Sequence, residues 1–481
     1  MLWLTWAVPI AAIVVLVLVV LLRTLAFRPR PDTPSAVLPV DFDQQKAIDD
    51  LQCMIRCATV SSYDASAEDE GEFQKFLALL PDLFPEVHRV CSFEATGRRG
   101  LLYGWKGISD ANPTVLMAHY DVVPVHAELW EKPPFAGIIE SGELWGRGTL
   151  DTKATLNGIL QAAETLIKQD FVPENDIWFA FGGNEEVEGQ DAPATVALLD
   201  QRGIRPALVI DEGGAVVDNI FPGVHKPCAV IGTGEKGMMH FEMAAESIGG
   251  HASAPPPRSS IGLLAEACLK VESSPFRKRL SPAVAEMFDT LGRYSTWVYR
   301  LIFANLWLFS GVLDLICQKK GGELNALLRT TVAWTQASGS KQTNVMPARA
   351  TMNANLRLMT GDAVESVLDY LARTIDNPDL KLQAVSSHEP SAISETGDCS
   401  SWLKVKRSVQ AVWPEAIISP YLMIACSDAR HYCRISDHVY RFSAMTMSGE
   451  HRKTIHGNNE RIPLDTIGQP VAFYLHLMRQ C

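Results

Sequence analysis

The apolar residues in the first half of the chain form short unbroken runs, and stretches with helical spacing separate these runs. The runs at 114–119, 176–182 and 207–211 are typical of strands that are buried on both faces of a sheet. Between them, apolar residues spaced three and four apart predict helices over 152–168 and 192–202. Buried strands that alternate with helices predict an α/β fold in which a mostly parallel sheet is flanked by helices.

The pattern changes after residue 230 and predicts a compact α+β module. We expect this module to occupy 230–388, as an insertion into a catalytic domain formed by 42–229 and 389–481. Strands are predicted at 240–245, 330–334, 351–358 and 380–385, helices of the module at 261–271 and 363–374, and two earlier amphipathic helices at 42–57 and 72–83.

A very apolar segment, 297–309, lies within the module, inside the longer stretch 275–328. Three explanations are open for it. It fills the core of the module, it packs on a lipid bilayer, or it accepts a fatty acyl chain. The second and third explanations gain weight from an apolar segment at the N-terminus.

The N-terminal segment 2–22 has no charged residue. About twenty apolar residues, at ~1.5 Å per residue, cross a bilayer core of roughly 30 Å. Trp3 and Trp6 suit the headgroup region at one end, and three arginines follow the other end at 23–30. We predict an uncleaved single-pass membrane anchor and a Pro-rich tether over 23–41, with a cleaved signal peptide and a buried helix as alternatives. The arginines favour a cytoplasmic body, but three charges leave the side of the membrane open.

Length and charge restrict the class of protein. A chain of 481 residues exceeds what one hydrophobic core usually supports, so two domains are expected. The net charge of −12 argues against a nucleic-acid partner, which needs a basic face. The ten cysteines are scattered and contain no C-x-x-C pair, so they indicate neither a disulfide framework nor a cysteine zinc site.

Ionisable residues follow the buried strands, at the edge of a parallel sheet where ligands bind. His119 ends the first strand, and Asp121 suits a carboxylate that orients an imidazole. Glu185 and Glu186 follow the second strand and point in different directions, so one can bind a metal ion while the other takes a proton from water. A structural His–Asp pair and a solvated acidic turn are the simpler explanations for each pair alone.

Three further stretches offer metal ligands. Asp151 opens a helix, either as its N-cap or as a carboxylate that bridges two metal ions. Asp211 and Glu212 end the third strand, and His456 lies near the C-terminus. Each stretch is weak alone, but five of them in this order indicate a shared metal centre.

The five stretches resemble, in order and spacing, those of the co-catalytic zinc metallopeptidases that include aminoacylase, carboxypeptidase S, glutamate carboxypeptidase and succinyl-diaminopimelate desuccinylase. The resemblance runs from about residue 45 to the end. It is carried by His-x-Asp-Val-Val-Pro at His119, Gly-Arg-Gly…Asp-x-Lys around Asp151 and Glu-Glu-x-x-Gly at Glu185. The Asp-Glu-Gly-Gly form at 211–214, the anchor and the long insertion look most like carboxypeptidase S and the N-fatty-acyl-amino-acid synthase/hydrolase.

This resemblance implies two zinc ions per chain. His119 would bind one ion, Asp151 would bridge both, and Glu186 would bind the second ion with His456 beside it. The remaining ligand falls at Asp211 or at its neighbour 212, with Asp211 favoured by analogy with carboxypeptidase S.

The resemblance also implies catalytic and substrate-binding roles. Asp121 would orient the first imidazole, and Glu185 would be the general base and later the proton donor. The inserted module matches a lid and dimerisation domain, in which His251 would stabilise the oxyanion, either within its own chain or in trans within a homodimer. Asn344 would contact the substrate, and Arg430 would clamp a substrate carboxylate. The simpler explanations are a surface arginine for Arg430 and a core histidine for His251.

We therefore expect a membrane-anchored di-zinc hydrolase that cleaves the amide bond of an N-acyl amino acid or a short peptide. N-acyl amino acids, with fatty-acyl chains among them, rank just above short peptides, and the reverse condensation is chemically allowed. The competing hypothesis is a catalytically dead, membrane-tethered binding protein. Such a protein typically loses ligands or the base, whereas every expected ligand type is present here.

Overall fold

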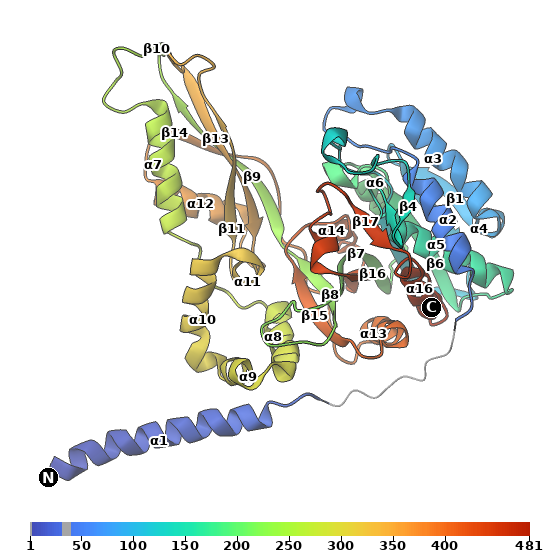
Figure 1. Cartoon of the computed structure of the whole chain (residues 1–481), viewed down its shortest axis with the longest axis horizontal. Helices are drawn as coiled ribbons and strands as arrows, with labels where there is room; N and C mark the ends of the chain where they lie inside the picture. The colour runs from blue at the N-terminus through green and yellow to red at the C-terminus, as the bar shows by residue number, and fades with distance from the viewer. Residues whose placement is uncertain (1, 31–39) are drawn as a thin grey trace.

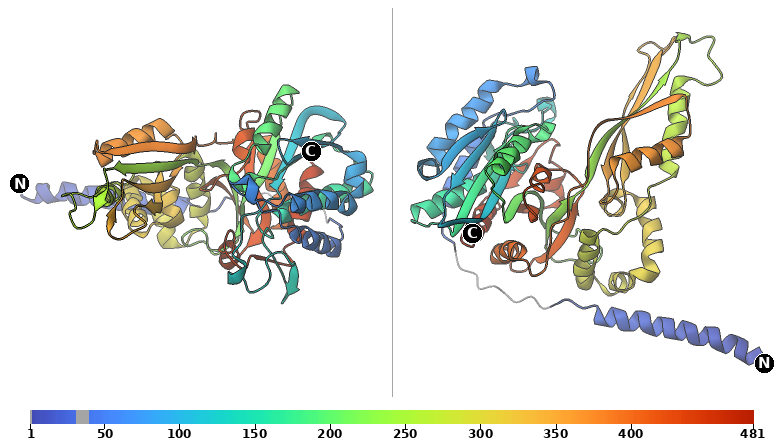
Figure 2. Two further views of the ribbon diagram at one scale, coloured as in Figure 1. Left: turned by 90° about the horizontal axis from the view of Figure 1, so that it is seen from above. Right: turned by 180° about the vertical axis from the view of Figure 1, so that it is seen from behind.

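Two sheets organise the body of the protein in the computed structural model, which describes residues 2–30 and 40–481 (Figure 1). The larger sheet has eight strands in the order β1-β2-β6-β3-β7-β16-β8-β15, and the smaller has four in the order β11-β13-β9-β14. The views in Figures 1 and 2 place the two sheets in separate halves of the body.

The larger sheet is parallel at its centre, where β6, β3, β7 and β16 are successive parallel neighbours. The side chains of β6 are buried along its whole length, as the unbroken apolar run predicts. The strands of this sheet are β1 Ser92–Thr96, β2 Gly100–Trp105, β3 Ser109–His119, β6 Asn175–Gly182, β7 Leu208–Val217, β8 Cys228–Glu235, β15 Ile417–Met423 and β16 Val439–Met447.

Helices cover both faces of the larger sheet. One face packs against α2, α5, α13 and α16 in the main hydrophobic core, and the other packs against α6 and α14 in a smaller core. The helices of this domain are α2 Gln44–Ile55, α3 Glu70–Leu83, α4 Pro85–Val90, α5 Lys153–Lys168, α6 Asp191–Gln201, α13 Ser400–Val412, α14 Ala429–Tyr432, α15 Gly449–Arg452 and α16 Gly468–Met478. A small three-stranded sheet joins β4 Ile138–Glu140, β5 Glu143–Trp145 and β17 Arg461–Pro463.

The smaller sheet carries two helices on one face and has its own hydrophobic core. Its elements are β9 Gly237–Glu246, α7 Ser260–Ser273, β11 Thr331–Ser338, β13 Arg349–Leu358, α12 Val364–Ile375 and β14 Leu380–His388. At its far end, β10 Gly250–His251 pairs with β12 Val345–Met346. These elements match the predicted α+β module.

Four helices lie between α7 and β11 at the base of the module, namely α8 Pro282–Tyr294, α9 Trp297–Ala304, α10 Leu306–Lys320 and α11 Gly322–Ala326. The buried face of α8 packs against β15 and belongs to the core of the larger domain. The predicted boundary at residue 230 falls inside β8. Within the apolar segment, Phe303 is buried in the main core, whereas Trp297 and Trp307 are exposed.

The N-terminal helix α1, Leu2–Ala26, extends beyond the predicted anchor into the first residues of the predicted tether. Residues 31–39 of that tether lie outside the described part of the chain. Residues Trp6–Ala26 are long and apolar enough to cross a membrane. The α/β fold with a mostly parallel sheet, the second α+β unit and the apolar N-terminal helix are confirmed.

A fully buried ion pair joins strands β16 and β8 of the larger sheet. Arg441 on β16 donates from Nε to Glu235 on β8 over 2.9 Å and from Nη1 to the carbonyl oxygen of Val439 over 2.9 Å. Both charged side chains have no exposed surface. Each charge therefore depends on the other for compensation.

We expect Arg441→Met to lower the free energy of unfolding by about 3–5 kcal/mol, because Glu235 then keeps a buried charge without its cation. Adding Glu235→Gln to Arg441→Met restores part of the lost free energy of unfolding, because it removes the uncompensated buried charge. As a control, Arg349→Met removes a solvent-exposed ion pair with Glu242 and costs less than about 1 kcal/mol. Denaturant unfolding of these variants tests the expectation, and equal losses in the two single variants would contradict it.

Candidate metal centre

The carboxyl ends of the central parallel strands bring five sequence segments together. His119 is the last residue of β3, and Glu185 and Glu186 follow the end of β6. Glu212 lies on β7, and Asp151 lies in the loop before α5. Because parallel neighbours end at one edge of the sheet, side chains far apart in sequence converge there.

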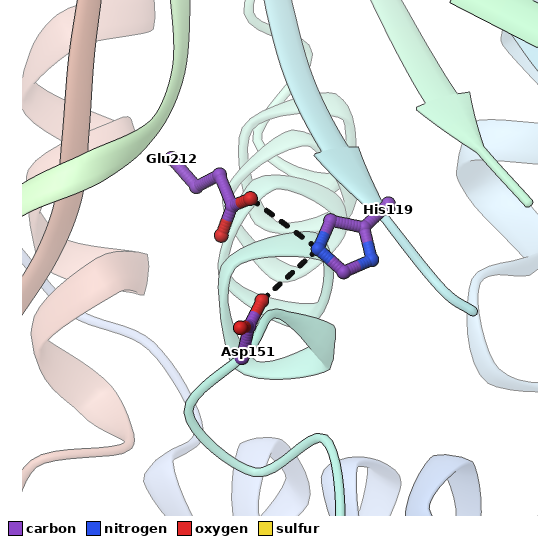
Figure 3. A group of neighbouring side chains, drawn as sticks. All are labelled: His119, Asp151 and Glu212. Atoms are coloured by element: carbon purple, nitrogen blue, oxygen red, sulfur yellow. Dashed lines mark hydrogen bonds and ion pairs between the residues drawn. The ribbon is translucent and has the colours of Figure 1, made fainter. Parts of the chain in front are cut away.

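Three of these residues form a compact group, which Figure 3 shows. The Nε2 atom of His119 lies 3.0 Å from Oδ1 of Asp151 and 3.3 Å from Oε1 of Glu212. One potential ligand atom from each residue lies within 4.8 Å of the others. Imidazole nitrogen and carboxylate oxygen are common ligands of zinc.

A second group shares Asp151 with the first. Its other oxygen, Oδ2, lies 3.0 Å from Nε2 of His456, and the same nitrogen lies 3.0 Å from Oε2 of Glu186. His456 reaches this position from the turn after α15 and has a positive φ of 56°. The carboxylate of Asp151 thus presents one oxygen to each group, as expected for a ligand that bridges two metal ions.

Asp121 connects the first imidazole with the acidic turn. Its Oδ1 lies 3.4 Å from Nδ1 of His119 and accepts a hydrogen bond from the backbone N–H of Glu185. Its Oδ2 accepts hydrogen bonds from Ser61 Oγ and from the backbone N–H of Glu186. Asp121 is fully buried, so it fixes the ring of His119 and the start of the turn together.

Glu460 has a positioning role that the sequence motifs alone did not reveal. It accepts hydrogen bonds from Arg147 Nη1 over 2.6 Å and from the backbone N–H groups of Gly148, Leu150 and Asp151. It therefore holds the loop that carries Asp151 against the C-terminal turn. A signal was present in the sequence, since a glutamate follows the second histidine and an arginine lies in the Gly-Arg-Gly stretch.

The structure places Glu212, rather than the favoured Asp211, beside His119. The side chain of Asp211 accepts hydrogen bonds from the backbone N–H groups of Glu212 and Ala429, at 2.9 Å each. It is therefore turned toward α14. Successive side chains of β7 point to opposite faces of the sheet, so only Glu212 reaches His119.

The electrostatics show a strongly negative site. Burial raises the pKa of Glu185 well above its usual range, and burial and nearby Asp151 raise the pKa of Glu212 to about 8. Hydrogen bonds with Asp151 and Glu186 raise the pKa of His456 to about 10. Burial alone would raise the pKa of Asp151, but hydrogen bonds with the two imidazoles outweigh it and lower that pKa.

These shifts indicate that the residues fit a cation. Several carboxylates share a buried site, and the imidazoles take up protons to compensate their charge. A divalent metal ion supplies that compensation without protonated ligands. The donor set, imidazoles and carboxylates with one carboxylate shared between two groups, is of the kind that binds zinc.

The remaining predicted residues lie outside this cluster. His251 in β10 and Asn344 lie together at the far end of the smaller sheet, where the backbone N–H of Ala252 donates to the carbonyl oxygen of Asn344. Figure 1 shows β10 far from β7. Arg430 on α14 is half-buried and donates from Nη1 to the carbonyl oxygen of Ser427 over 2.6 Å.

A cavity of about 370 Å³ opens beside the metal-ligand cluster. Asp151, Glu185, Glu186, Glu212 and His456 line its polar end. Its apolar wall is formed mainly by Ala215, Val217, Ile220, Val230, Met423, Met447 and Ile455. The site therefore joins a polar reaction centre to an apolar chamber of the size that small ligands occupy.

Comparison with known proteins agrees with this geometry. The profile of Peptidase family M20/M25/M40 matches residues 115–480. Probable carboxypeptidase S-like 2 of Dictyostelium discoideum is 32% identical, over 96% of this chain and 92% of that protein. An N-fatty-acyl-amino acid synthase/hydrolase of Danio rerio is also 32% identical, over 98% of this chain and 94% of that protein.

Solved structures share the fold. Human carnosine dipeptidase 1 superposes with a TM-score of 0.65 at 14% identity, over 91% of this chain and 96% of that chain. The M20 family metallo-carboxypeptidase Sso-CP2 from Sulfolobus solfataricus gives a TM-score of 0.64 at 16% identity, over 90% and 98% of the two chains. The sequence matches and the shared fold lead to one conclusion: the chain belongs to Peptidase family M20/M25/M40 and is a hydrolase of this metallopeptidase family.

Proposed function

We propose that this hydrolase cleaves the amide bond of N-acyl amino acids, with a fatty acyl chain in the apolar cavity. The observation that carries the proposal is the direct connection between the carboxylate and imidazole cluster and an apolar wall. Unmodified dipeptides offer little apolar surface for such a wall, whereas each buried methylene of an acyl chain contributes about 0.8 kcal/mol. The synthase/hydrolase of Danio rerio, named for fatty-acyl amino acids, supports this substrate class.

We propose two zinc ions as the cofactor. His119 and Glu212 would hold one ion, Glu186 and His456 the other, and Asp151 both. When bound, the ions polarise the amide carbonyl and acidify a water molecule. Asp121 keeps the ring of His119 in its binding orientation.

Glu185 would be the general base. Its carboxylate lies beside the cluster, with Oε2 3.9 Å from Nε2 of His119, and it lines the cavity. The raised pKa caused by burial suits a group that accepts a proton from the attacking water and returns it to the leaving nitrogen. The same path in reverse would join a free fatty acid and an amino acid when both are concentrated.

We also propose that α1 is retained as a membrane anchor. Its last turns contact the body, since Arg23 donates from Nε and Nη2 to the carbonyl oxygen of Ala304. Thr24 and Asn305 are buried where the two helices meet and are hydrogen-bonded to each other. A segment removed as a signal peptide has no need of such specific contacts.

The exposed end of the smaller sheet supports a proposal of a homodimer. His251 and Asn344 lie at this end with exposed side chains and are remote from their own cluster. In a dimer formed through the smaller sheet, they would approach the cluster of the second copy, where an imidazole can stabilise an oxyanion. Arg430 remains a candidate for the substrate carboxylate: burial lowers the pKa of its guanidinium, but nearby carboxylates, Asp428 first and Glu185 among them, outweigh burial and raise it.

We expect purified enzyme to contain two zinc ions per chain, and Glu212→Ala to lose about half of this metal because it removes a ligand of one ion. Asp211→Asn should keep both ions, since that side chain binds backbone N–H groups instead. Elemental analysis after dialysis measures the metal content. Loss of metal in Asp211→Asn with retention in Glu212→Ala would restore Asp211 as the ligand.

Glu185→Gln should lower kcat by about 10²–10⁴-fold, because the amide cannot accept the proton of the attacking water. The variant keeps its zinc, since Glu185 is outside both ligand groups. Steady-state kinetics with an N-acyl amino acid, together with elemental analysis, measure both properties. Near wild-type turnover would refute the assignment of the base.

Val230→Thr should selectively weaken activity on long acyl chains, because a hydroxyl in the cavity wall must be desolvated by the chain. We expect kcat/KM for a long-chain acyl amino acid to fall about tenfold, while the value for the N-acetyl analogue changes little. Kinetics over a series of acyl chain lengths measure this change.

Val216→Thr is the matched control. Its side chain points to the opposite face of β7 from Ala215 and Val217, away from the cavity. We expect it to lower stability without changing the preference for chain length. If the wild-type enzyme prefers an unmodified dipeptide over every acyl amino acid, the substrate is a peptide and the acyl proposal is wrong.

A further inference from the structure

The α9–α10 helix pair exposes an unusual concentration of apolar side chains. Outside α1, the exposed tryptophans of the described residues are Trp297 on α9 and Trp307 on α10. Large exposed apolar side chains on the pair, here called the elbow face, are Trp297, Val298, Tyr299, Trp307, Leu308, Val312, Leu315 and Ile316. Scattered single apolar residues are normal on a protein surface, but a contiguous group marks an interaction site.

The elbow face is continuous along α10. Leu308, Val312 and Leu315 follow one another at intervals of four and three residues, which places them on one side of the helix. The acidic residue of this helix, Asp314, is turned inward and paired with Arg329. Between Leu306 and Cys317 every exposed residue of α10 is apolar or glycine, as expected for a helix that contacts lipid rather than water.

The N-terminal helix is attached where α9 and α10 meet. Asn305, between the two helices, donates from Nδ2 to the carbonyl oxygen of Val20 over 3.3 Å and to Oγ1 of Thr24 over 3.2 Å. Arg23 donates to the carbonyl oxygen of Ala304 on α9. The contact thus uses the last turns of the apolar span Trp6–Ala26.

This contact fixes the depth of the elbow relative to a membrane. Thr24 is two residues from the end of the span at Ala26, or ~3 Å along the helix axis. If α1 crosses a bilayer, the junction of α9 and α10 therefore lies at the boundary between hydrocarbon and headgroups. Figure 1 shows α9, α10 and the C-terminal end of α1 at one corner of the body, from which α1 leads outward.

The residues around the elbow face fit this boundary. Tryptophan is enriched at membrane interfaces because its ring is apolar and its N–H is polar. α10 bends away from α9 by 112° and ends in the exposed basic pair Lys319 and Lys320. Basic side chains beside an apolar face attract anionic headgroups.

We infer that the elbow face is a second membrane contact, which lies in the headgroup region of the bilayer that α1 spans. The inference rests on the proposed retention of α1 as an anchor. A second copy of the chain is the other occupant to test. The bilayer is favoured because the elbow face continues directly into the apolar surface of α1, which needs lipid in any case.

Fluorescent probes on the full-length chain test this inference. An NBD group is attached to Val312→Cys or Leu315→Cys on the elbow face, to Val14→Cys in α1 and to Val385→Cys on the exposed side of β14. Each variant is reconstituted in phosphatidylcholine–phosphatidylglycerol vesicles. Quenching by a shallow doxyl lipid and by aqueous iodide is then compared, after subtraction of the signal from labelled chain without an added cysteine. Retained hydrolase activity shows that each variant is folded.

We expect probes at 312 and 315 to be quenched by the doxyl lipid and to have iodide quenching constants several-fold lower than the probe at 385. If the probe at 14 is quenched by the doxyl lipid while the probes at 312 and 315 are quenched by iodide as strongly as the probe at 385, the second contact is wrong and the anchor stands. If the probes at 312 and 315 are shielded from both quenchers, protein covers the elbow face, and its occupant is a second copy of the chain rather than the bilayer. If 14 itself is accessible to iodide, the anchor and the second contact both fail.

Discussion

The shared carboxylate of Asp151 is the constraint on which the site depends. Its two oxygens lie 3.0 Å from the imidazole nitrogens of His119 and His456, which are separated by most of the chain. The loop that carries Asp151 cannot shift without breaking both contacts. Glu460 fixes that loop by accepting three backbone N–H groups and the guanidinium of Arg147. The C-terminal turn and the loop before α5 are therefore held in a fixed position relative to each other.

One sheet supplies both the polar cluster and the apolar chamber because β7 changes its surroundings along its length. Glu212 belongs to the cluster, and Ala215 and Val217 a few residues later line the cavity. The glycines between them permit close approach, since a side chain at Gly214 would collide with the carbonyl oxygen of Val230. A low-dielectric wall beside ionised groups also strengthens every charge interaction in the cluster.

Much of this arrangement could be predicted from the sequence. Apolar runs identify the buried strands, and parallel strands end at one edge, so the convergence of His119 with the acidic turn after β6 follows from pattern alone. The alternative between Asp211 and Glu212 could not be decided, because a shift of one residue along a strand reverses the direction of its side chain. The structure decides the direction through the backbone N–H of Ala429, which is distant in sequence and binds Asp211.

Helix α8 shows a second limit of sequence reasoning. The sequence pattern assigns no element at this helix, which lies in the stretch 275–328, and the partner of its buried face proves to be β15 of the larger domain. The same limit applies to the segment 297–309, in which Phe303 is core while Trp297 and Trp307 are exposed. Pattern alone gives three explanations for this segment, and packing shows that part of it is core and part is exposed.

The position of α11 relates the inferred membrane contact to the reaction site. α11 follows α10 after Gly321, and its Glu323 lines the cavity, paired with Arg452 at the other side of the wall. The chain therefore passes from the elbow face to the cavity wall within a few residues. A fatty-acyl amino acid is amphiphilic and concentrates at a bilayer surface, with its chain in hydrocarbon and its carboxylate in the headgroup region. If the body were held against that surface at α10, it would encounter substrate that diffuses in the plane of the bilayer. The wall of the chamber would then lie close to the lipid.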